Sequence, residues 1–322
     1  MQIFFSGTKP TGEHTHLGNY FGAIKQFVDL QNGENRTNIY FIANYHALTT
    51  ERDGTKLVTN TWNILREYIA YGIDPKKSII FIQSDVPEHT ELAWIFNCLT
   101  PFGLLERAHA YKDALSKGKE ASAGLFAYPV LMAADILIYQ STHVPVGKDQ
   151  KQHVEIARDI AEKFNHYYGE TFVLPQAVIM EETATVTGID GEKMSKSYHN
   201  TISPFEDEKS LVKKIMSLKT DSKGIDEPKD LAGNIIYQYL ELVGDEHLCK
   251  QVKERFLKGG MGYGEAKKLL AQAMLDYFAP MRKKYHMITQ TDLENIVKEG
   301  AIQAKVIARR TIDTVRNKVG IV

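Results

Sequence analysis

The sequence predicts an α/β protein, with a Rossmann-type parallel sheet followed by a helical domain. In the first half of the chain, short runs of wholly apolar residues alternate with longer segments in which apolar residues recur at helical spacing. Apolar runs of this kind are typical of parallel strands that are covered on both faces. After about residue 203 only helical patterns remain. We therefore expect two domains, at 1–187 and 188–322.

The elements follow from these patterns in chain order. Strands are expected at 2–6, 38–43, 78–83 and 143–146, with helices between and after them at 19–30, 55–71, 88–99, 128–139 and 149–167. The second domain should contain helices at 204–217, 231–243, 245–257, 264–285 and 293–319. In open parallel sheets, ligands bind at the carboxyl ends of the strands. Candidate functional residues should therefore lie in the loops that follow strands.

The composition is that of a globular protein, with 43% hydrophobic and 25% charged residues in 322. No run of about 18 apolar residues is present, which excludes a membrane span, and the N-terminus lacks the basic start of a signal peptide. Two cysteines, Cys98 and Cys249, suit a reducing cytoplasm and exclude a Cys-rich metal site. The net charge of −1 neither favours nor excludes nucleic acid as a partner.

The segment 191–197 reads as a loop that carries two ammonium groups three residues apart, on Lys193 and Lys196. Ser195 and Ser197 add hydroxyl groups that could orient a ligand. Two point charges on a flexible backbone suit a developing pyrophosphate. The alternative is an ordinary solvated loop.

The segment 6–19 runs from the first strand through a Gly/Pro/Thr loop into a helix that begins near Gly18 or Asn19. Backbone N–H groups at such a helix start favour an anion. Gly18 allows a nucleotide ring to approach closely. His16 and Asn19 lie one helical turn apart and can face the same phosphate or ring. The alternative is a plain strand–helix turn with a Thr cap.

The helix at 128–139 is apolar almost all round and should be buried, with Pro129 in its first turn. Asp135 is its one ionisable group, and it shares a face with Tyr128 and Met132. A face of this kind is suited to line a pocket for a flat apolar ring that carries one N–H. We infer that this N–H donates one of the hydrogen bonds that the buried Asp135 carboxylate needs. The alternative is a structural ion pair or a hydrogen bond to backbone.

Two further segments follow strands. Asp149 and Gln152 have capping-box spacing, so that Asp149 caps a helix, accepts from ribose hydroxyls, or does both. Gln150 offers a donor and an acceptor to the ammonium or carboxylate of an amino acid. His46 comes just after a central strand, at the ligand edge of the sheet, although a lone histidine is more often structural.

These motifs resemble those of class I aminoacyl-tRNA synthetases. Residues 193–197 match the KMSKS signature letter for letter, and His16-Leu17-Gly18-Asn19 resembles the HIGH signature. The segments at 131–137 and 144–153 look specific to the tryptophanyl members, and the resemblance extends from about residue 4 to about 318. It implies a homodimeric bacterial-type ligase that joins L-tryptophan to tRNA(Trp) in the cytoplasm, using ATP with Mg²⁺. A tyrosyl-tRNA synthetase-like enzyme is the nearest alternative.

The resemblance also implies residue roles. The catalytic residues would be His16, Asn19, Lys193 and Lys196. The ATP-binding residues would be Lys9, Pro10, Thr11, Gly18, Asn19, Gly147, Lys148, Asp149, Ile189, Lys193, Met194, Ser195, Lys196 and Ser197. Tryptophan would be bound by Phe5, Gly7, His46, Tyr128, Met132, Asp135, Val144, Val146 and Gln150. Mg²⁺ would bridge phosphates, so no protein metal site is expected. The first domain would be catalytic, and the second would carry the KMSKS loop and bind the anticodon.

The chain departs from the family pattern at several positions. Lys9 stands where the family commonly has Gln, Lys148 replaces a usual acid, and one extra residue lies between Gly12 and His16. A lysine often found two positions after Lys112 is replaced by Ala114, with Lys117 or Lys119 as possible substitutes.

A basic run near the C-terminus contains Lys305, Arg309, Arg310, Arg316 and Lys318. Either it contacts RNA, or it lies on a helix that is solvated or docked against acidic partners.

Overall fold

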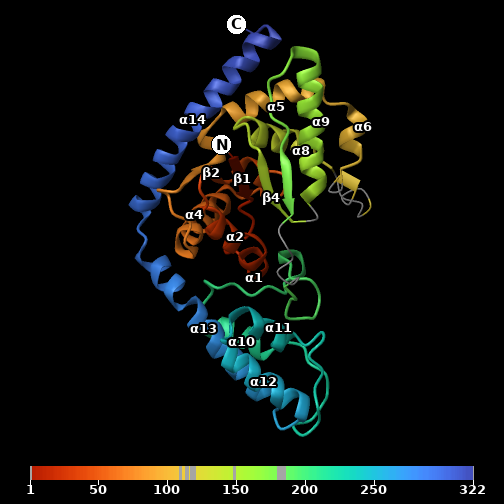
Figure 1. Cartoon of the computed structure of the whole chain (residues 1–322), viewed down its shortest axis with the longest axis vertical. Helices are drawn as coiled ribbons and strands as arrows, with labels where there is room; N and C mark the ends of the chain where they lie inside the picture. Colours follow the sequence, from red (N-terminus) through yellow and green to blue (C-terminus); the bar gives the residue numbers. More distant parts are fainter. Residues whose placement is uncertain are drawn as a thin grey trace.

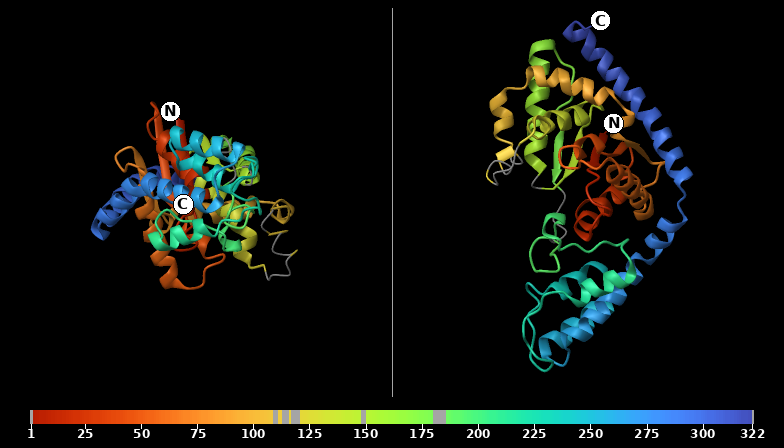
Figure 2. Two further views of the ribbon diagram at one scale, coloured as in Figure 1. Left: turned by 90° about the horizontal axis from the view of Figure 1, so that it is seen from below. Right: turned by 180° about the vertical axis from the view of Figure 1, so that it is seen from behind.

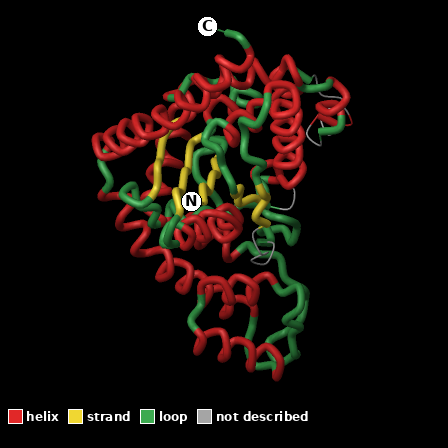
Figure 3. The backbone as a smooth tube through the Cα atoms, turned by 45° about the horizontal axis from the view of Figure 1, so that its top comes forward, coloured by secondary structure: helices red, strands yellow, loops and turns green. Residues whose placement is uncertain are grey.

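The computed structural model describes residues 2–108, 111–112, 116, 121–147, 150–179 and 186–321. The described residues form a parallel sheet of five strands in the order β3-β2-β1-β4-β5. The strands are β1 (Gln2–Thr8), β2 (Arg36–Ile42), β3 (Ser78–Ile82), β4 (His143–Val146) and β5 (Gln176–Ile179). All are confined to the upper part of the molecule (Figure 3). The four expected strands are confirmed. The short β5 was missed because four residues after Pro175 give too weak a pattern.

Helices cover both faces of the sheet, as continuous apolar strands require. Along β2, Tyr40 and Ile42 belong to one core cluster and Ile39 and Phe41 to the other. The first cluster is covered by α1 (Leu17–Asn19), the π-helical turn η1 (Tyr20–Ile24), α2 (Lys25–Leu30) and α4 (Gly54–Tyr71). The second is covered by α5 (Glu88–Leu99), α8 (Ala123–Leu137) and α9 (Lys151–Tyr168).

Local signals explain where the principal helices begin and end. Asp53 caps α4 by accepting from the backbone N–H of Thr55 at 2.9 Å, and Gly72, with a φ of 112°, ends that helix. Helix α8 begins five residues earlier than expected, at Ala123 rather than at 128, because the Ser122 hydroxyl accepts from the N–H of Leu125. Pro129 therefore lies inside α8, and the expectation that it occupies the first turn was wrong.

Below the sheet, the chain forms a module of helices α10 (Glu208–Met216), α11 (Ile235–Val243), α12 (Glu246–Lys258) and α13 (Tyr263–Met287) (Figure 1). The helical patterns expected after residue 203 are confirmed, with shifts of a few residues at their ends. Helix α13 leads out of this module toward the sheet.

The last helix, α14 (Gln290–Val319), returns to the sheet and runs along its edge strand β3 (Figures 1 and 2). The approach is so close that a Cβ on Gly300 would overlap the carbonyl oxygen of Ile80. Covering an edge strand in this way hides its unpaired backbone groups. The division of the chain at residues 187 and 188 stays a prediction, but α14, which lies in the second of these ranges, packs on β3 of the sheet.

Two basic residues of the C-terminal run contact acidic partners on α5. Arg309 Nε lies 3.2 Å from Glu88 Oε1, and Arg316 donates to both carboxylate oxygens of Glu91 at 2.6 Å. The docked alternative therefore holds for these two residues. Among the described residues, no helix has the length and apolar character that crossing a membrane requires.

Candidate functional site

The candidate site lies where the strand order reverses. Strand β1 pairs with β2 on one side and with β4 on the other, so the loops that leave the carboxyl ends of β1 and β4 diverge to opposite faces. This is the position at which open α/β sheets bind ligands. The loop after β1 carries the residues from Lys9 to Asn19, and the loop after β4 begins at Gly147.

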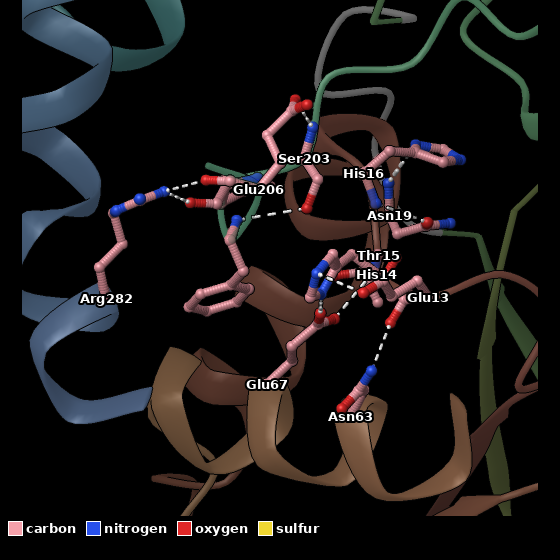
Figure 4. Close-up of polar contacts among 12 residues, drawn as sticks. Glu13, His14, Thr15, His16, Asn19, Asn63, Glu67, Ser203, Glu206 and Arg282 are labelled. Atoms are coloured by element: carbon pink, nitrogen blue, oxygen red, sulfur yellow. Dashed lines mark hydrogen bonds and ion pairs between the residues drawn. The ribbon is translucent and has the colours of Figure 1, made fainter. Parts of the chain in front are cut away.

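His16 and Asn19 form a reciprocal cap at the start of α1 (Figure 4). The Asn19 N–H lies 3.3 Å from His16 Nδ1, and the His16 N–H lies 3.1 Å from Asn19 Oδ1. The cap expected from a Thr is thus supplied by His16. Burial and the charge of Lys196 lower the pKa of His16 to about 4, so its ring is neutral at pH 7. Since Nδ1 accepts, Nε2 carries the proton and can donate to an anion.

Two half-buried lysines lie in or against the loop after β1. Lys9 Nζ donates to the Thr49 hydroxyl at 2.8 Å, and Lys196 Nζ donates to the carbonyl oxygen of Thr11. Burial lowers the pKa of both lysines. Both ammonium groups are held by neutral oxygen atoms, which leaves positive charge in the site for a polyanionic ligand. Gly12, with a φ of 80°, lies directly against the Lys196 side chain.

The segment 186–200 is a compact turn that brings Lys196 to the β1 loop. Its base is closed by a hydrogen bond of 3.0 Å from the Met194 N–H to the Val186 carbonyl, and Met194 is buried. Lys193 lies at the exposed side of the turn. Ile189 is tied to the helical module through its carbonyl, which accepts from the Lys219 N–H at 3.0 Å. The turn therefore contacts both the sheet domain and the helical module.

Asn200 organises this turn and was missed by sequence reasoning. Its Nδ2 donates to Asp190 Oδ1 at 2.8 Å and to the Lys193 carbonyl at 3.1 Å, while its Oδ1 accepts from the Ser195 N–H at 2.8 Å. Asn200 is buried, and a Cβ on Gly188 would overlap its amide. An Asn three residues after a Lys/Ser loop is the only sequence signal, and it is a weak one.

Asp135 lies at the centre of a hydrogen-bond network formed by the protein itself. His46 Nε2 lies 2.8 Å from Oδ2, His89 Nδ1 lies 2.6 Å from Oδ1, and Gln83 Nε2 donates to both oxygens at 2.8 and 3.0 Å. Burial alone would raise the pKa of Asp135, but the hydrogen bonds from His46 and His89 lower it to about 2. The partners are side chains, not backbone groups, and sequence reasoning missed Gln83 and His89.

The other expected tryptophan-binding residues surround this network. The His46 and Tyr128 rings meet edge to face with centroids 6.3 Å apart, and the Tyr128 hydroxyl is hydrogen-bonded to His153. Burial raises the pKa of Tyr128 to about 12. Met132 on α8 and Val146 at the end of β4 are half-buried.

Three more of these residues lie on the strands, and one begins a helix. Phe5 and Val144 are buried, and Phe5 stacks on Phe41 with ring centroids 4.9 Å apart. Gly7 lies against the same Phe41 ring, which leaves no space for a Cβ. Gln150 is the N-cap residue of α9.

Several expected residues belong to the segments that the structure does not describe. Lys148, Asp149, Ala114, Lys117 and Lys119 lie outside the described residues, as does the side chain of Ser197. Within the described part of the chain, no group of three or more His, Cys, Asp or Glu side chains is arranged to hold a metal ion.

Comparison with known proteins identifies the family. The family model described as "tRNA synthetases class I (W and Y)" matches residues 1–279. Tryptophan–tRNA ligase of Fusobacterium nucleatum is 48% identical over 325 residues, covering 100% of this chain and 99% of that protein. The chain belongs to the class I tRNA synthetases of the tryptophan and tyrosine type.

Solved structures of this family have the same fold. Tryptophanyl-tRNA synthetase from Campylobacter jejuni, complexed with ADP and tryptophan, superposes with a TM-score of 0.93 at 49% identity, covering 99% of this chain and 100% of that one. The Mycoplasma pneumoniae synthetase superposes with a TM-score of 0.83 at 28% identity, covering 99% of this chain and 98% of that one. The α/β fold with a helical C-terminal region is therefore that of a class I synthetase.

Proposed function

We propose that this chain is a tryptophan–tRNA ligase. It activates L-tryptophan with ATP, giving tryptophanyl-adenylate and pyrophosphate, and then transfers the tryptophanyl group to tRNA(Trp). The observation that carries this proposal is 48–49% identity to tryptophan–tRNA ligases over essentially the whole chain. The tyrosyl alternative is not favoured, because relatives at 47–49% identity over the full chain are tryptophan–tRNA ligases.

ATP would bind over the start of α1. The Nε2–H of His16 and the ammonium groups of Lys193 and Lys196 would contact the phosphates. Asn19 would hold His16 in the required tautomer through the reciprocal cap. The remaining proposed ATP contacts are Lys9, Pro10, Thr11, Gly18, Gly147, Lys148, Asp149, Ile189, Met194, Ser195 and Ser197.

Tryptophan would bind between α8 and the carboxyl ends of β1 and β4. His46, Gln83 and His89 already make four hydrogen bonds to Asp135, two of them from the single Nε2 of Gln83. A carboxylate offers about four acceptor positions, so an indole N–H would take one of the two that Gln83 shares. The other proposed contacts are Phe5, Gly7, His46, Tyr128, Met132, Val144, Val146 and Gln150. Discrimination against Phe would follow, because a ring without an N–H leaves that acceptor position unused.

Adenylate formation requires in-line attack of the tryptophan carboxylate on the α-phosphate of ATP. The chain's residues would position both reactants and stabilise the charge that develops on the departing pyrophosphate. The phosphate-facing groups described above are cations and N–H donors, so we expect Mg²⁺ to take its ligands from the phosphates and water. When bound, it would neutralise triphosphate charge. Closure of the turn at 186–200 over the site would exclude water from the labile adenylate.

Three finer assignments belong to the same proposal. The helical module, α10 to α13, would bind the anticodon arm of tRNA(Trp). The chain would act as a homodimer, which is supported by large apolar side chains at the surface of α5 and α6 (Phe102–Glu106), where Trp94 and Phe102 are 70% and 65% exposed. A cytoplasmic location is supported by its two free cysteines.

An ATP–pyrophosphate exchange assay across tryptophan, tyrosine and phenylalanine tests the proposal. We expect rapid exchange with tryptophan alone, followed by charging of tRNA(Trp) when tRNA is added. Exchange that depends on tyrosine would show that the chain is a tyrosyl-tRNA synthetase. No exchange with any aromatic amino acid would refute the activity altogether.

A further inference from the structure

Glu67 is a buried carboxylate directly beneath the loop that enters α1. It lies on α4, its side chain has 0% exposure, and no substrate contact is assigned to it. Its Oε2 accepts from the Thr15 N–H at 2.9 Å, and its Oε1 lies 2.7 Å from Nδ1 of His14 (Figure 4). A carboxylate that is buried away from water needs such hydrogen-bond donors. The position of Glu67 therefore fixes the positions of the Thr15 N–H and the His14 ring.

The two residues held by Glu67 immediately precede His16, the N-cap of α1. Thr15 is secured a second time, because its hydroxyl lies 2.9 Å from the hydroxyl of Tyr71 on α4. On the far side of His16, the Leu17 N–H donates to the Ile202 carbonyl at 2.9 Å. His16 is therefore held between an anchor on α4 and a segment that follows the turn at 186–200.

Other charged and titratable groups face the same pocket. His14 also lies 3.9 Å from Glu13 Oε1, and Glu206 acts on it electrostatically from the segment before α10. Tyr285 on α13 meets the His14 ring edge to face. Burial would lower the pKa of His14, but the hydrogen bond and charge of Glu67 raise it above its ordinary value.

The charge of Glu67 also acts on Lys196, which is proposed to contact the phosphates. Burial lowers the pKa of Lys196, and the negative charge of Glu67 opposes that shift. Lys196 in turn donates to the Thr11 carbonyl, at the other end of the same loop. Glu67 thus acts on both ends of the segment from Thr11 to His16 that faces the proposed triphosphate.

We propose that Glu67 is a positioning residue for ATP: it holds the Thr15 backbone and the His14 ring so that His16 and the start of α1 are preformed for the phosphates. It does not touch the substrate. The inference rests on the proposed ATP-dependent function, and it assigns to the buried α4 carboxylate the task of fixing the loop that enters α1.

Three variants separate geometry from charge. Glu67→Ala removes both hydrogen bonds. Glu67→Gln keeps them, since its amide oxygen can accept from the Thr15 N–H while its NH₂ group donates to His14 Nδ1, but it removes the charge. Asn63→Ala is the matched control, because Asn63 lies one turn earlier on α4 and donates to the Glu13 carbonyl at 3.3 Å from a more exposed position.

Direct ATP binding by calorimetry and pyrophosphate-exchange kinetics give the readouts. We expect Glu67→Ala to weaken ATP binding and raise the KM for ATP by about tenfold or more, with the KM for tryptophan changed less than about twofold. Glu67→Gln should restore most of the loss, and Asn63→Ala should behave as the unchanged protein. In Glu67→Gln, the alkaline limb of kcat/KM for ATP should move to lower pH. The substitution removes the negative charge that raises the pKa of Lys196, so this lysine should lose its proton at lower pH.

Equal increases in the two KM values, or unchanged ATP binding by folded Glu67→Ala, would overturn the proposal. If Glu67→Ala does not fold, His14→Ala removes one of the two contacts, and an unchanged ATP affinity in folded His14→Ala would overturn the proposal as well. Calorimetry keeps this result separate from the proposed function. Failure of the unaltered protein to exchange pyrophosphate would refute that function while leaving the effect of Glu67 on ATP binding measurable.

Discussion

The side chain of Asp135 on α8 accepts from Nε2 of His46, 2.8 Å away, although 89 residues separate the two in the chain. His46 lies just after β2, at the edge of the sheet where ligands are expected to bind. The contact therefore links this edge of the sheet to helix α8. His89 extends the network, since its Nδ1 lies 2.6 Å from Asp135 and its Nε2 lies 2.7 Å from the Tyr139 hydroxyl. The carboxylate is thus a structural centre of the pocket as well as its proposed indole acceptor.

Asp135→Ala should therefore destabilise the ligand-free protein by roughly 3–5 kcal/mol, because it leaves the donors of half-buried His46 and buried Gln83 and His89 without their acceptor. Removing a buried charge that lacked such partners would instead leave stability unchanged or improve it. Chemical unfolding measures the change, with exposed Asp276→Ala as a control that should stay within about 0.5 kcal/mol. A variant as stable as the unaltered protein would mean that the network contributes nothing to folding.

Acid should weaken the fold through the same residue. The pKa of Asp135 is lowered to about 2 in the folded protein, below its ordinary value of 3.8. A lowered carboxyl pKa stabilises the fold above the ordinary value, and this contribution is lost as the pH falls toward 2. The shift corresponds to roughly 2 kcal/mol. Unfolding curves between pH 5 and pH 2 should show the loss, and Asp135→Asn should flatten this part of the pH dependence.

Gly300→Ala should be among the more damaging single-methyl changes in the chain. The added Cβ would overlap the Ile80 carbonyl of β3, so α14 would have to move away from the sheet edge at a cost of about 1–3 kcal/mol or more. Gly264→Ala, near the start of α13, is the matched control, because a Cβ there meets no atom within 4 Å. It should be neutral or stabilising by up to about 1 kcal/mol. Equal urea midpoints for both variants would show that α14 can shift freely.

The parts of the fold that were predictable depend on short-range patterns. The reciprocal cap joins His16 and Asn19, which are three residues apart, so their spacing on a helix was enough to predict that they lie on the same side. Apolar runs located β1 to β4 for the same reason, and the rule that ligands bind at the carboxyl ends of strands indicated the loops of the candidate site.

The parts that were missed depend on the tertiary fold. Gln83 and His89 come to Asp135 from η2 (Gln83–Asp85) and α5, 52 and 46 residues earlier in the chain, and periodicity carries no information about such pairings. Helix α14 was expected as a helix, but its packing on β3 depends on Gly300, whose closeness to Ile80 only the fold reveals.

Salt should distinguish tRNA contact from the internal pairing of the basic C-terminal residues. If tRNA binds through phosphate contacts, aminoacylation should weaken with salt more steeply than tryptophan activation does. Arg316 pairs with Glu91, so Arg316→Ala should lower the melting temperature and leave the aminoacylation salt slope unchanged. Arg310→Ala, which changes an exposed residue of the same helix α14, serves as the comparison variant. A shallower slope in Arg316→Ala would place that residue on the tRNA, and equal slopes for the two reactions would exclude phosphate contact.

Lys193 and Lys196 should differ in what they contribute, because the structure places them differently. Both charges are proposed to engage the phosphates as pyrophosphate departs, so Lys193→Ala and Lys196→Ala should each slow adenylate formation by about 10²–10³-fold, with tryptophan affinity changed less than about twofold. Lys193 is exposed, whereas Lys196 is half-buried and bonded to the Thr11 carbonyl. Lys196→Ala should therefore also weaken ATP binding before any chemistry occurs.

Single-turnover adenylate formation and tryptophan binding by fluorescence separate these effects. Lys219→Ala is the matched control, since its side chain lies beside Gly191 on the helical-module side of the same turn and should leave the rate near that of the unaltered protein. Parallel losses of tryptophan affinity and rate in both variants would count against a role on the phosphates. A Lys196→Ala protein with unchanged ATP affinity would show that the Thr11 contact does not preform the site, because the charge would then act only as pyrophosphate leaves.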